Sequence, residues 1–93
     1  EVIFLNKNNE LTEGSITNIF IVKNNFLYTP SLASGLLAGT LREYLIKEKR
    51  VKETKIYLKD LLEAEKVYVG NSLRGLLEAD IEQVRGSGII SKV

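Results

Sequence analysis

The chain contains no cysteine and no histidine. Without cysteine it can form no disulfide, no thiolate nucleophile and no zinc–thiolate site. Without histidine it lacks the commonest general base and the commonest transition-metal ligand. Any chemistry that these residues perform must therefore use lysine, arginine, acidic or hydroxyl side chains, or backbone amides, and no metal site is predicted.

Long apolar runs and an excess of one charge are also missing. No run approaches the roughly 20 apolar residues that span a bilayer, and no secretory signal pattern opens the sequence. We therefore predict no membrane segment, and a reducing cytoplasm is the expected location. The net charge of +1 gives no reason to expect nucleic acid or an anionic membrane as a partner.

Methionine is absent as well, and Glu1 leads directly into an apolar stretch, residues 2–5. Natural chains begin with methionine and usually keep a polar segment before the first strand. We therefore expect residues 1–93 to be a single, partial domain of a longer protein. The composition, with 44% apolar and 27% charged residues, is that of an ordinary globular protein.

The hydrophobic pattern predicts a mixture of strands and two helices. Strands are expected over residues 2–5, 16–22, 26–28, 51–57 and 67–69, with a last hairpin formed by residues 81–85 and 89–90. Helices are expected over residues 39–49 and 58–66, and a loop or single helical turn over residues 70–79. Asparagines predict turns at residues 6–9 and 24–25. Hairpins at both ends favour an α+β fold over a doubly wound parallel sheet.

The segment GLLAGT, residues 35–40, runs directly into the first predicted helix. A helix N-terminus carries unpaired amides and about half a positive charge, so it suits an anion such as phosphate. Gly39 allows close approach of the backbone, and Thr40 adds a hydroxyl. The alternative is that Gly35 and Gly39 only shape a loop and Thr40 only caps the helix. Within this helix we expect Leu41, Tyr44 and Leu45 on the buried face, with Arg42 and Glu43 elsewhere.

A second segment, TEGSITN, places Glu13 just before a predicted strand. A carboxylate beside an apolar strand must find a partner or stay at the surface. Glu13 could accept a hydrogen bond from a cationic ring nitrogen. It could equally be a surface turn residue, with Ser15 or Asn18 capping the local backbone.

A third segment, VYVGNSLRGLLEAD, has a predicted buried strand that ends in polar residues. Arg74 could clamp a carboxylate through two parallel hydrogen bonds. The alternative is a solvated arginine paired with Glu78 or Asp80, worth well under about 1 kcal/mol.

Together the three segments resemble the fold-type IV pyridoxal-phosphate enzymes, a family of branched-chain and D-amino-acid aminotransferases and aminodeoxychorismate lyases. Residues 13–20 are similar to the family's EGS…N-[IL]-F strand entry, and residues 36–42 to its LLPG-hydrophobic-x-R phosphate loop. Residues 71–75, NSLRG, resemble the lyase branch, because aminotransferases more often carry Gly-Thr-Ala there. The resemblance covers essentially the whole chain and implies a mixed, mostly antiparallel sheet or barrel-like C-terminal domain with two helices.

The resemblance also implies a role for each matching position. The cofactor would be pyridoxal 5′-phosphate, with Glu13 bonded to its ring nitrogen and Asn18 fixing the strand behind Glu13. The cofactor phosphate would be held by groups at the helix start and the third segment, namely Gly39, Thr40, Leu41 and Ser72. Leu73 and Arg74 would face the substrate carboxylate.

This sequence departs from the family pattern at two points. Ala38 stands where the family often has proline, so the phosphate loop is expected to be less rigid. The family's covalent lysine lies about thirty-odd residues before the glutamate, whereas only twelve residues precede Glu13. We therefore expect that lysine, and the family's N-terminal domain, to lie outside this chain, and the chain alone to be catalytically inactive.

The resemblance implies an aminodeoxychorismate lyase-like enzyme, which would eliminate pyruvate from 4-amino-4-deoxychorismate and leave 4-aminobenzoate for folate synthesis. The alternative within the family is an aminotransferase acting on branched-chain or D-amino acids. In either case the partner is a small amino substrate, and a homodimer is implied for the full-length enzyme. A third hypothesis is a non-catalytic anion-binding or assembly module, since fold does not guarantee function.

Overall fold

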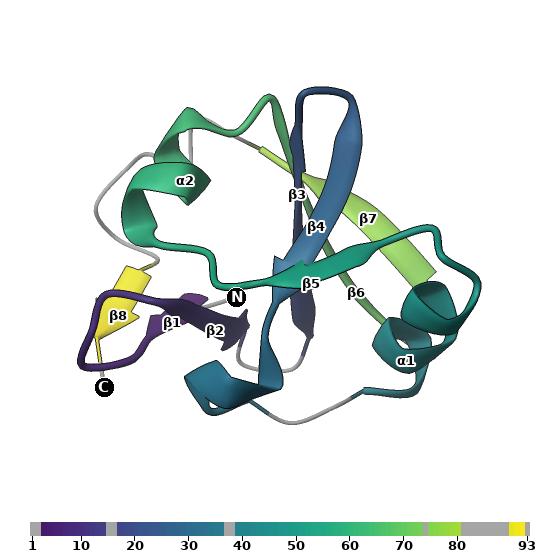
Figure 1. Ribbon diagram of the computed structural model, residues 1–93, viewed down its shortest axis with the longest axis horizontal. Helices are drawn as coiled ribbons and strands as arrows, with labels where there is room; N and C mark the ends of the chain where they lie inside the picture. The colour runs from purple at the N-terminus through teal and green to yellow at the C-terminus, as the bar shows by residue number, and fades with distance from the viewer. Residues whose placement is uncertain (1–2, 15–16, 37–38, 74, 81–89, 93) are drawn as a thin grey trace.

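The computed structural model in Figure 1 describes residues 3–14, 17–36, 39–73, 75–80 and 90–92. Its strands form a three-stranded sheet with the order β2-β1-β8 and a five-stranded sheet with the order β5-β4-β3-β6-β7. The first sheet consists of β1 (Ile3–Leu5), β2 (Leu11–Gly14) and β8 (Ile90–Lys92). The second consists of β3 (Asn18–Lys23), β4 (Phe26–Pro30), β5 (Lys52–Thr54), β6 (Lys66–Asn71) and β7 (Gly75–Ala79).

Two α-helices complete the fold, α1 (Thr40–Lys47) and α2 (Leu58–Glu63), with a short 3-10 helix, η1 (Leu32–Ser34), after β4. In the five-stranded sheet β4 pairs with β5 in parallel, and the other neighbours are antiparallel. In the three-stranded sheet β1 pairs with β2 antiparallel and with β8 in parallel. The expected α+β fold, a mixed and mostly antiparallel sheet with two helices, is confirmed.

The central strand β3 buries side chains on both of its faces. Ile19 and Ile21 point to one core cluster, and Phe20 points to a second. Because successive side chains of a strand alternate between faces, an unbroken apolar run is the pattern that a strand covered on both sides requires. This explains why residues 19–22 are apolar without interruption.

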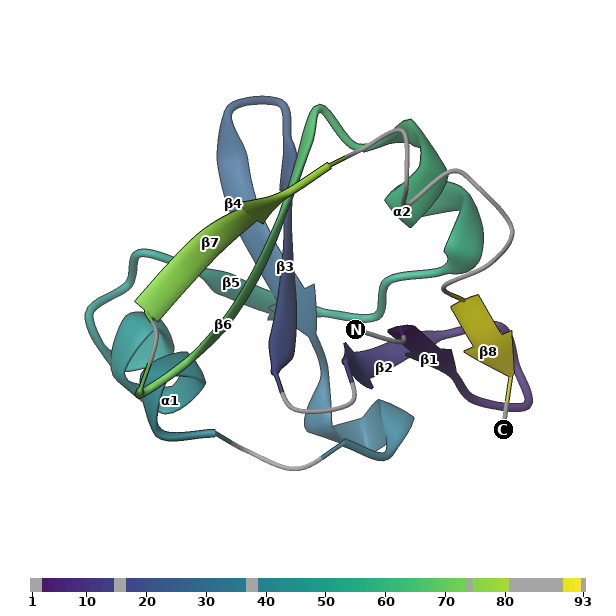
Figure 2. The same ribbon diagram turned by 180° about the vertical axis from the view of Figure 1, so that it is seen from behind.

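Each face of β3 is covered by one helix. Leu61 of α2 belongs to the cluster that contains Ile19 and Ile21, together with residues of β1 and β2. Leu45 of α1 belongs to the cluster that contains Phe20. Figures 1 and 2 show the resulting layout, with α1 and α2 at opposite ends of the molecule.

The two predicted asparagine turns are confirmed. Asn24 and Asn25 both have positive φ, 54° and 62°, and join the antiparallel strands β3 and β4. Two consecutive left-handed residues match the twist of a two-residue hairpin, and asparagine adopts this conformation more readily than most residues. In the first turn Asn9 has a φ of 60°, and the Asn6 side chain accepts a hydrogen bond from the Asn8 amide at 2.9 Å.

The expectation of a loop or helical turn over residues 70–79 was wrong. Residues 75–79 form β7, which pairs antiparallel with β6 through Val69↔Leu77 and Gly70↔Leu76. The sequence GLLEA has no strand-like alternation, so its conformation is imposed by pairing with β6. Strand β2 was also not anticipated, because Leu11 is the one apolar side chain among its four residues, and the strand is specified by pairing with β1.

Several element bounds differ from those expected. Strand β5 covers only residues 52–54 of the predicted 51–57. Helix α1 ends at Lys47, because Lys49 takes a left-handed φ of 58° and the Arg50 amide donates back to the Leu45 carbonyl at 3.0 Å. Helix α2 ends at Glu63, three residues early. Residues 81–89 of the predicted last hairpin lie outside the described residues, and Ile90 pairs with β1 in parallel.

The buried face of α1 also differs from the expected one. Arg42, expected on the exposed side, is only 1% exposed, whereas Tyr44 is 53% exposed. Leu45 is buried as expected, and Leu41 packs against the same cluster. The expected placements of Arg42 and Tyr44 were therefore wrong, because Pro30 of β4 and Glu53 of β5 lie beside the first turn and supply the partners that allow Arg42 to be buried.

Candidate cofactor site

The first turn of α1 presents free amide positions at a helix start. Gly39 is the N-cap residue, with an extended backbone (φ −82°, ψ 156°), and among the described residues no side chain forms a capping hydrogen bond to the turn. The first intrahelical hydrogen bond runs from the Glu43 amide to the Gly39 carbonyl at 3.0 Å. The amides of Thr40 and Leu41 come before this first bond and so have no acceptor within the helix. They point out of the helix start, as an anion site requires.

Gly39 lies directly against Asn18, the first residue of β3. A Cβ built on Gly39 would be 2.3 Å from Asn18 Oδ1, closer than any side chain could be tolerated. Asn18 itself is buried, and it pairs with Gly70 of β6. Glycine at position 39 therefore lets the start of α1 dock against the start of β3.

A second close approach ties α1 to the end of β6. A Cβ on Gly70 would be 2.7 Å from the Gly75 carbonyl oxygen and 3.1 Å from Leu41 Cδ2. Leu41 is therefore anchored over the point where β6 ends and β7 begins. Its amide, the second of the helix, is fixed relative to the turn that joins these strands.

The third motif lies in that turn. Ser72 and Leu73 follow β6, and both are exposed, Leu73 at 89%. The Leu73 amide donates to Asn71 Oδ1 at 3.0 Å, an Asx turn that fixes the loop. Arg74 lies outside the described residues, so its predicted role stays a prediction.

Glu13 is on a neighbouring element. It lies in β2, one residue before the strand ends, and it is half-buried. Figures 1 and 2 place the end of β2, the start of β3 and α1 in sequence along one edge of the molecule, with β3 in the middle. In these views strand β2, which contains Glu13, and helix α1 lie on opposite sides of the start of β3, and the Leu41–Gly70 contact brings the third motif next to the helix.

Sequence reasoning missed a charged cluster behind the helix start. The Arg42 guanidinium forms ion pairs with Glu43 and Glu53, and Arg42 Nη2 donates to the Pro30 carbonyl at 3.0 Å. The sequence did contain a sign of this cluster, namely Arg42 in the first turn of a predicted helix, because a cation there opposes the helix dipole. Such a residue is expected only where other partners compensate it.

Glu53 has a lowered pKa. The main cause is a hydrogen bond that its carboxylate accepts from the Leu32 amide, at 3.1 Å, and the second is the bond from Arg42. Both favour the ionised form and outweigh the opposing effect of burial. Glu53 therefore remains a carboxylate over the whole neutral range and keeps Arg42 paired.

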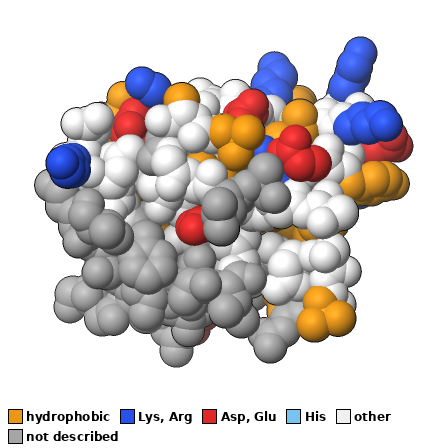
Figure 3. Space-filling view, turned by 90° about the horizontal axis from the view of Figure 1, so that it is seen from below, with side chains coloured by type: hydrophobic (Ala, Val, Ile, Leu, Met, Phe, Trp, Pro, Cys, Tyr) orange, Lys and Arg blue, Asp and Glu red, His pale blue; other side chains and the backbone are white. Residues whose placement is uncertain are grey.

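Charges of both signs stand side by side on the face of Figure 3, where Lys and Arg side chains neighbour Asp and Glu along one margin. The net charge of the chain is only +1, so attraction for a phosphate is expected to come from local groups such as the α1 amides. Within the described ranges, His, Cys, Asp and Glu form no group of three or more that could hold a metal ion. None of the described helices has the length and apolarity needed to cross a membrane.

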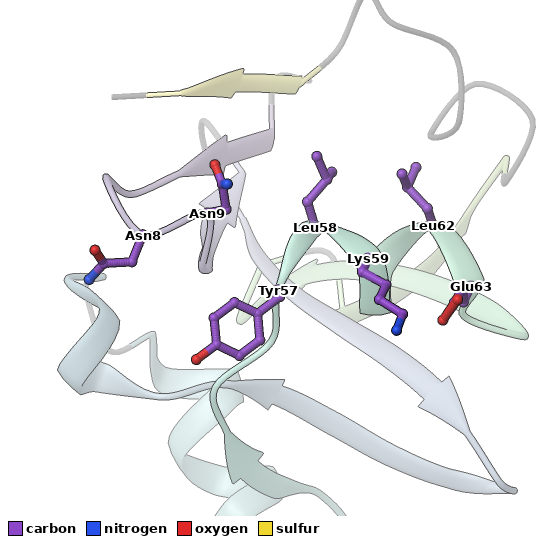
Figure 4. Close-up of a pocket in the computed structure, with 7 residues that line it drawn as sticks. All are labelled: Asn8, Asn9, Tyr57, Leu58, Lys59, Leu62 and Glu63. Carbon is purple, nitrogen blue, oxygen red and sulfur yellow. The ribbon is translucent and has the colours of Figure 1, made fainter.

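A surface hollow of about 610 Å³ lies elsewhere, between α2 and the β1–β2 turn (Figure 4). Leu58 and Leu62 point the same way above it, and Tyr57 points in a different direction. The other lining residues are Asn8, Asn9, Lys59 and Glu63. Helix α2, which lines this hollow, has only six residues, and the Asp60 carboxylate at its start accepts a hydrogen bond from the Tyr57 amide at 2.9 Å, so an acidic group already occupies this helix start. We therefore assign the candidate site to the α1 start.

Comparisons with known proteins found a family profile, several relatives and several solved structures that match this chain. The sequence profile of the family described as "Amino-transferase class IV" matches residues 1–80. A probable branched-chain-amino-acid aminotransferase of Thermotoga maritima is 38% identical over 82 residues, which are 83% of this chain and 30% of that protein. An aminodeoxychorismate lyase of Saccharomyces cerevisiae is 32% identical over 87 residues, 88% of this chain and 23% of that protein.

A solved structure from Mesorhizobium loti, assigned as an amino-acid aminotransferase, superposes on this fold with a TM-score of 0.80. It is 38% identical, and the match covers 100% of this chain and 40% of that one. The chain thus spans about a third or less of the curated relatives above, at 30% and 23% of their lengths.

Proposed function

Because this chain belongs to the class IV aminotransferases, the fold-type IV pyridoxal-phosphate enzymes, we propose that it supplies one wall of a pyridoxal-phosphate site in a longer enzyme. The observation that carries the proposal is the uncapped start of α1, docked against β3 through the Gly39–Asn18 contact. Enzymes of this family use pyridoxal 5′-phosphate.

The helix start fits the cofactor's phosphate. A phosphate needs several donors directed at one point, and the Thr40 and Leu41 amides leave the same turn in the same direction. The Thr40 side chain is exposed, so its hydroxyl can turn toward the same point. Ser72 lies in the β6–β7 turn, next to the strand end over which Leu41 is anchored. In the proposal it adds a second hydroxyl.

Glu13 is assigned to the other end of the cofactor. Its carboxylate, on β2, would accept a hydrogen bond from the pyridinium nitrogen and keep that nitrogen protonated. When bound, a protonated ring withdraws electrons from the substrate's α-carbon and so stabilises a carbanion there. Asn18, buried at the start of β3, would hold the strand entry that separates Glu13 from the phosphate donors.

Substrate binding is assigned to the β6–β7 turn. The Leu73 amide already donates to Asn71 Oδ1, so Leu73 would contribute its exposed side chain, and Arg74 would bind the substrate carboxylate. The lysine that holds the cofactor covalently would come from outside the chain. The proposal extends to a small amino compound as substrate and, as the family resemblance implies, to a homodimer.

Of the reactions known in the family, we favour elimination of pyruvate from 4-amino-4-deoxychorismate to give 4-aminobenzoate. The segment NSLRG, residues 71–75, supports this choice, as does the yeast lyase among the relatives. The second candidate is amino transfer from a branched-chain amino acid. It is supported by the higher identity, 38%, to the Thermotoga maritima protein.

The reactions are distinguished by assaying the longer protein that carries this chain. We expect 4-aminobenzoate and pyruvate in equal amounts from 4-amino-4-deoxychorismate, with little glutamate from a branched-chain amino acid and 2-oxoglutarate. The reverse result would establish the aminotransferase. Absence of both activities, with no lysine trapped by borohydride reduction, would favour the non-catalytic module.

The role of Glu13 is tested by the Glu13→Gln variant of that protein. We expect kcat to fall about 100-fold, because a preorganised electrostatic partner of the reacting system is lost, while the cofactor stays bound. Glu63→Gln, the same chemical change on the exposed side of α2, is the matched control and should leave kcat unchanged. Equal activity of the two variants would refute the assignment of Glu13.

A further inference from the structure

We propose that Arg42 is a positioning residue that holds the phosphate-binding turn in place by joining both ends of the loop that precedes it. This inference rests on the proposed pyridoxal-phosphate site. Arg42 is 1% exposed, and it ranks among the largest fully buried side chains of the described residues. Its own backbone belongs to the first turn of α1, so the contacts that hold its side chain also restrain that turn.

The loop in question covers residues 31–39, between the end of β4 and the start of α1. Arg42 Nη2 donates to the carbonyl of Pro30, the last residue of β4, at 3.0 Å. It also pairs with Glu53 of β5, whose carboxylate accepts the Leu32 amide at 3.1 Å. One guanidinium at the far end of the loop is therefore bonded, directly and through Glu53, to the near end.

Helix stability alone does not explain this residue. A cation in the first turn opposes the helix dipole, and a buried ion pair is often no more stabilising than an apolar pair of the same volume. Among the described residues, Arg42 Nε is also buried without a hydrogen-bond acceptor. The arrangement instead fixes the orientation of the first turn of α1, because the planar guanidinium holds its hydrogen-bond partners in one geometry.

Direct attraction of the phosphate does not explain it either. Arg42 contributes +1, and its partners Glu43 and Glu53 contribute −2, so the cluster carries a formal charge of −1. A cluster of that sign does not attract an anion. The contribution of Arg42 to phosphate binding is therefore geometric, and it acts through the direction of the Thr40 and Leu41 amides.

The test compares the two acidic partners of Arg42 in the longer protein. Glu53→Ala removes the link that runs through Glu53 to the Leu32 amide, at the near end of the loop, whereas Glu43→Ala removes a partner on α1 itself. The measured quantity is the ratio of dissociation constants for pyridoxal and pyridoxal 5′-phosphate, obtained from cofactor absorbance. We expect Glu53→Ala to lower this preference for the phosphate about tenfold, and Glu43→Ala to leave it within about twofold.

The two ligands differ only by the phosphate, so a general loss of structure weakens both and leaves the ratio unchanged. Arg42→Met should lower the ratio at least as much as Glu53→Ala. The ratio for Arg42→Lys should fall between those of Arg42→Met and wild type, because a lysine ammonium keeps the charge but cannot reproduce the planar, forked set of donors of a guanidinium. If Arg42→Met fails to fold, comparison of Glu53→Ala with Glu43→Ala still tests whether Arg42 positions the phosphate-binding turn.

Failure of this inference can be told apart from failure of the proposed function. A wild-type protein that binds pyridoxal as tightly as pyridoxal 5′-phosphate would refute the phosphate site itself. A wild-type preference that persists in folded Glu53→Ala would refute only the role of Arg42.

Discussion

At the scale of single residues, contact between backbone and side chain sets the site. Because Gly39 has no side chain, the side-chain carboxamide of Asn18 can occupy the space beside it. In the same way, Gly70 allows Leu41 and the Gly75 carbonyl to approach β6. Neither Gly39 nor Gly70 has a positive φ, so glycine is required at these positions because it has no side chain. At Arg42, by contrast, a long side chain is needed, because it reaches from α1 to two neighbouring strands, β4 and β5.

Glu53 gives a prediction at this scale. Its pKa in the folded chain is lowered from an ordinary value of 4.5, so its ionised form stabilises the fold. That stabilisation is complete above the unfolded-state pKa and is lost as pH falls through the lower folded-state pKa. We therefore expect Glu53→Gln to be less stable than wild type at about pH 7, with the difference shrinking progressively below pH 4.5.

The measurement is urea unfolding of both chains at several pH values. Glu43→Gln is the matched control. The Glu43 carboxylate is about half exposed, so solvent screens its pairing with Arg42, and Glu43→Gln should change the free energy of unfolding by under about 1 kcal/mol. A stability difference between Glu53→Gln and wild type that grows on acidification would contradict the pKa direction.

At the scale of elements, α1 is held by two different kinds of contact. Leu45 joins Phe20 and Val51 in an apolar cluster, and Arg42 joins the ends of β4 and β5 in a polar one. The helix has only eight residues, too few to be stable alone. Its position, and with it the direction of its first amides, therefore depends on this packing.

A pair of substitutions tests which face of α1 is buried. Leu45→Ala should lower the free energy of unfolding by about 2–4 kcal/mol, because it leaves a cavity beside Phe20. Tyr44→Ala should change it by less than about 1 kcal/mol, since Tyr44 is 53% exposed. Denaturant titration of both variants measures the difference, and comparable losses would contradict the orientation of the helix.

At the scale of the whole molecule, the two small sheets share the core cluster on one face of β3, and some large apolar side chains stay exposed. Exposed large hydrophobic residues include Leu73 at 89% and Leu77 at 49%. Leu77 lies on β7, the edge of the five-stranded sheet among the described strands. An edge strand with apolar side chains is a site where further chain can pair.

The 93-residue chain is therefore expected to self-associate, and Leu77→Lys should reduce this. A lysine on an edge strand disfavours pairing of the edge with another copy. Leu32→Lys is the matched control, because Leu32 is similarly exposed, at 44%, but lies on η1 rather than on a sheet edge. Sedimentation velocity measures association, and equal reduction by both variants would show that pairing at β7 is not its cause.

The sequence by itself determined the elements whose conformation is local. Asn24-Asn25 specified a left-handed turn, the run at residues 19–22 specified a strand covered on both faces, and the spacing of three motifs specified the family. Each of these signals lies within a few neighbouring residues or in their order along the chain.

Only the tertiary structure decided β2, β7 and the burial of Arg42. GLLEA becomes a strand because β6 offers it unpaired backbone groups, and Arg42 is buried because Pro30 and Glu53, twelve and eleven residues away, converge on it. The physical reason is the same in both cases. Backbone pairing and charge compensation depend on which partners the fold brings within hydrogen-bond distance, and no local pattern contains that information.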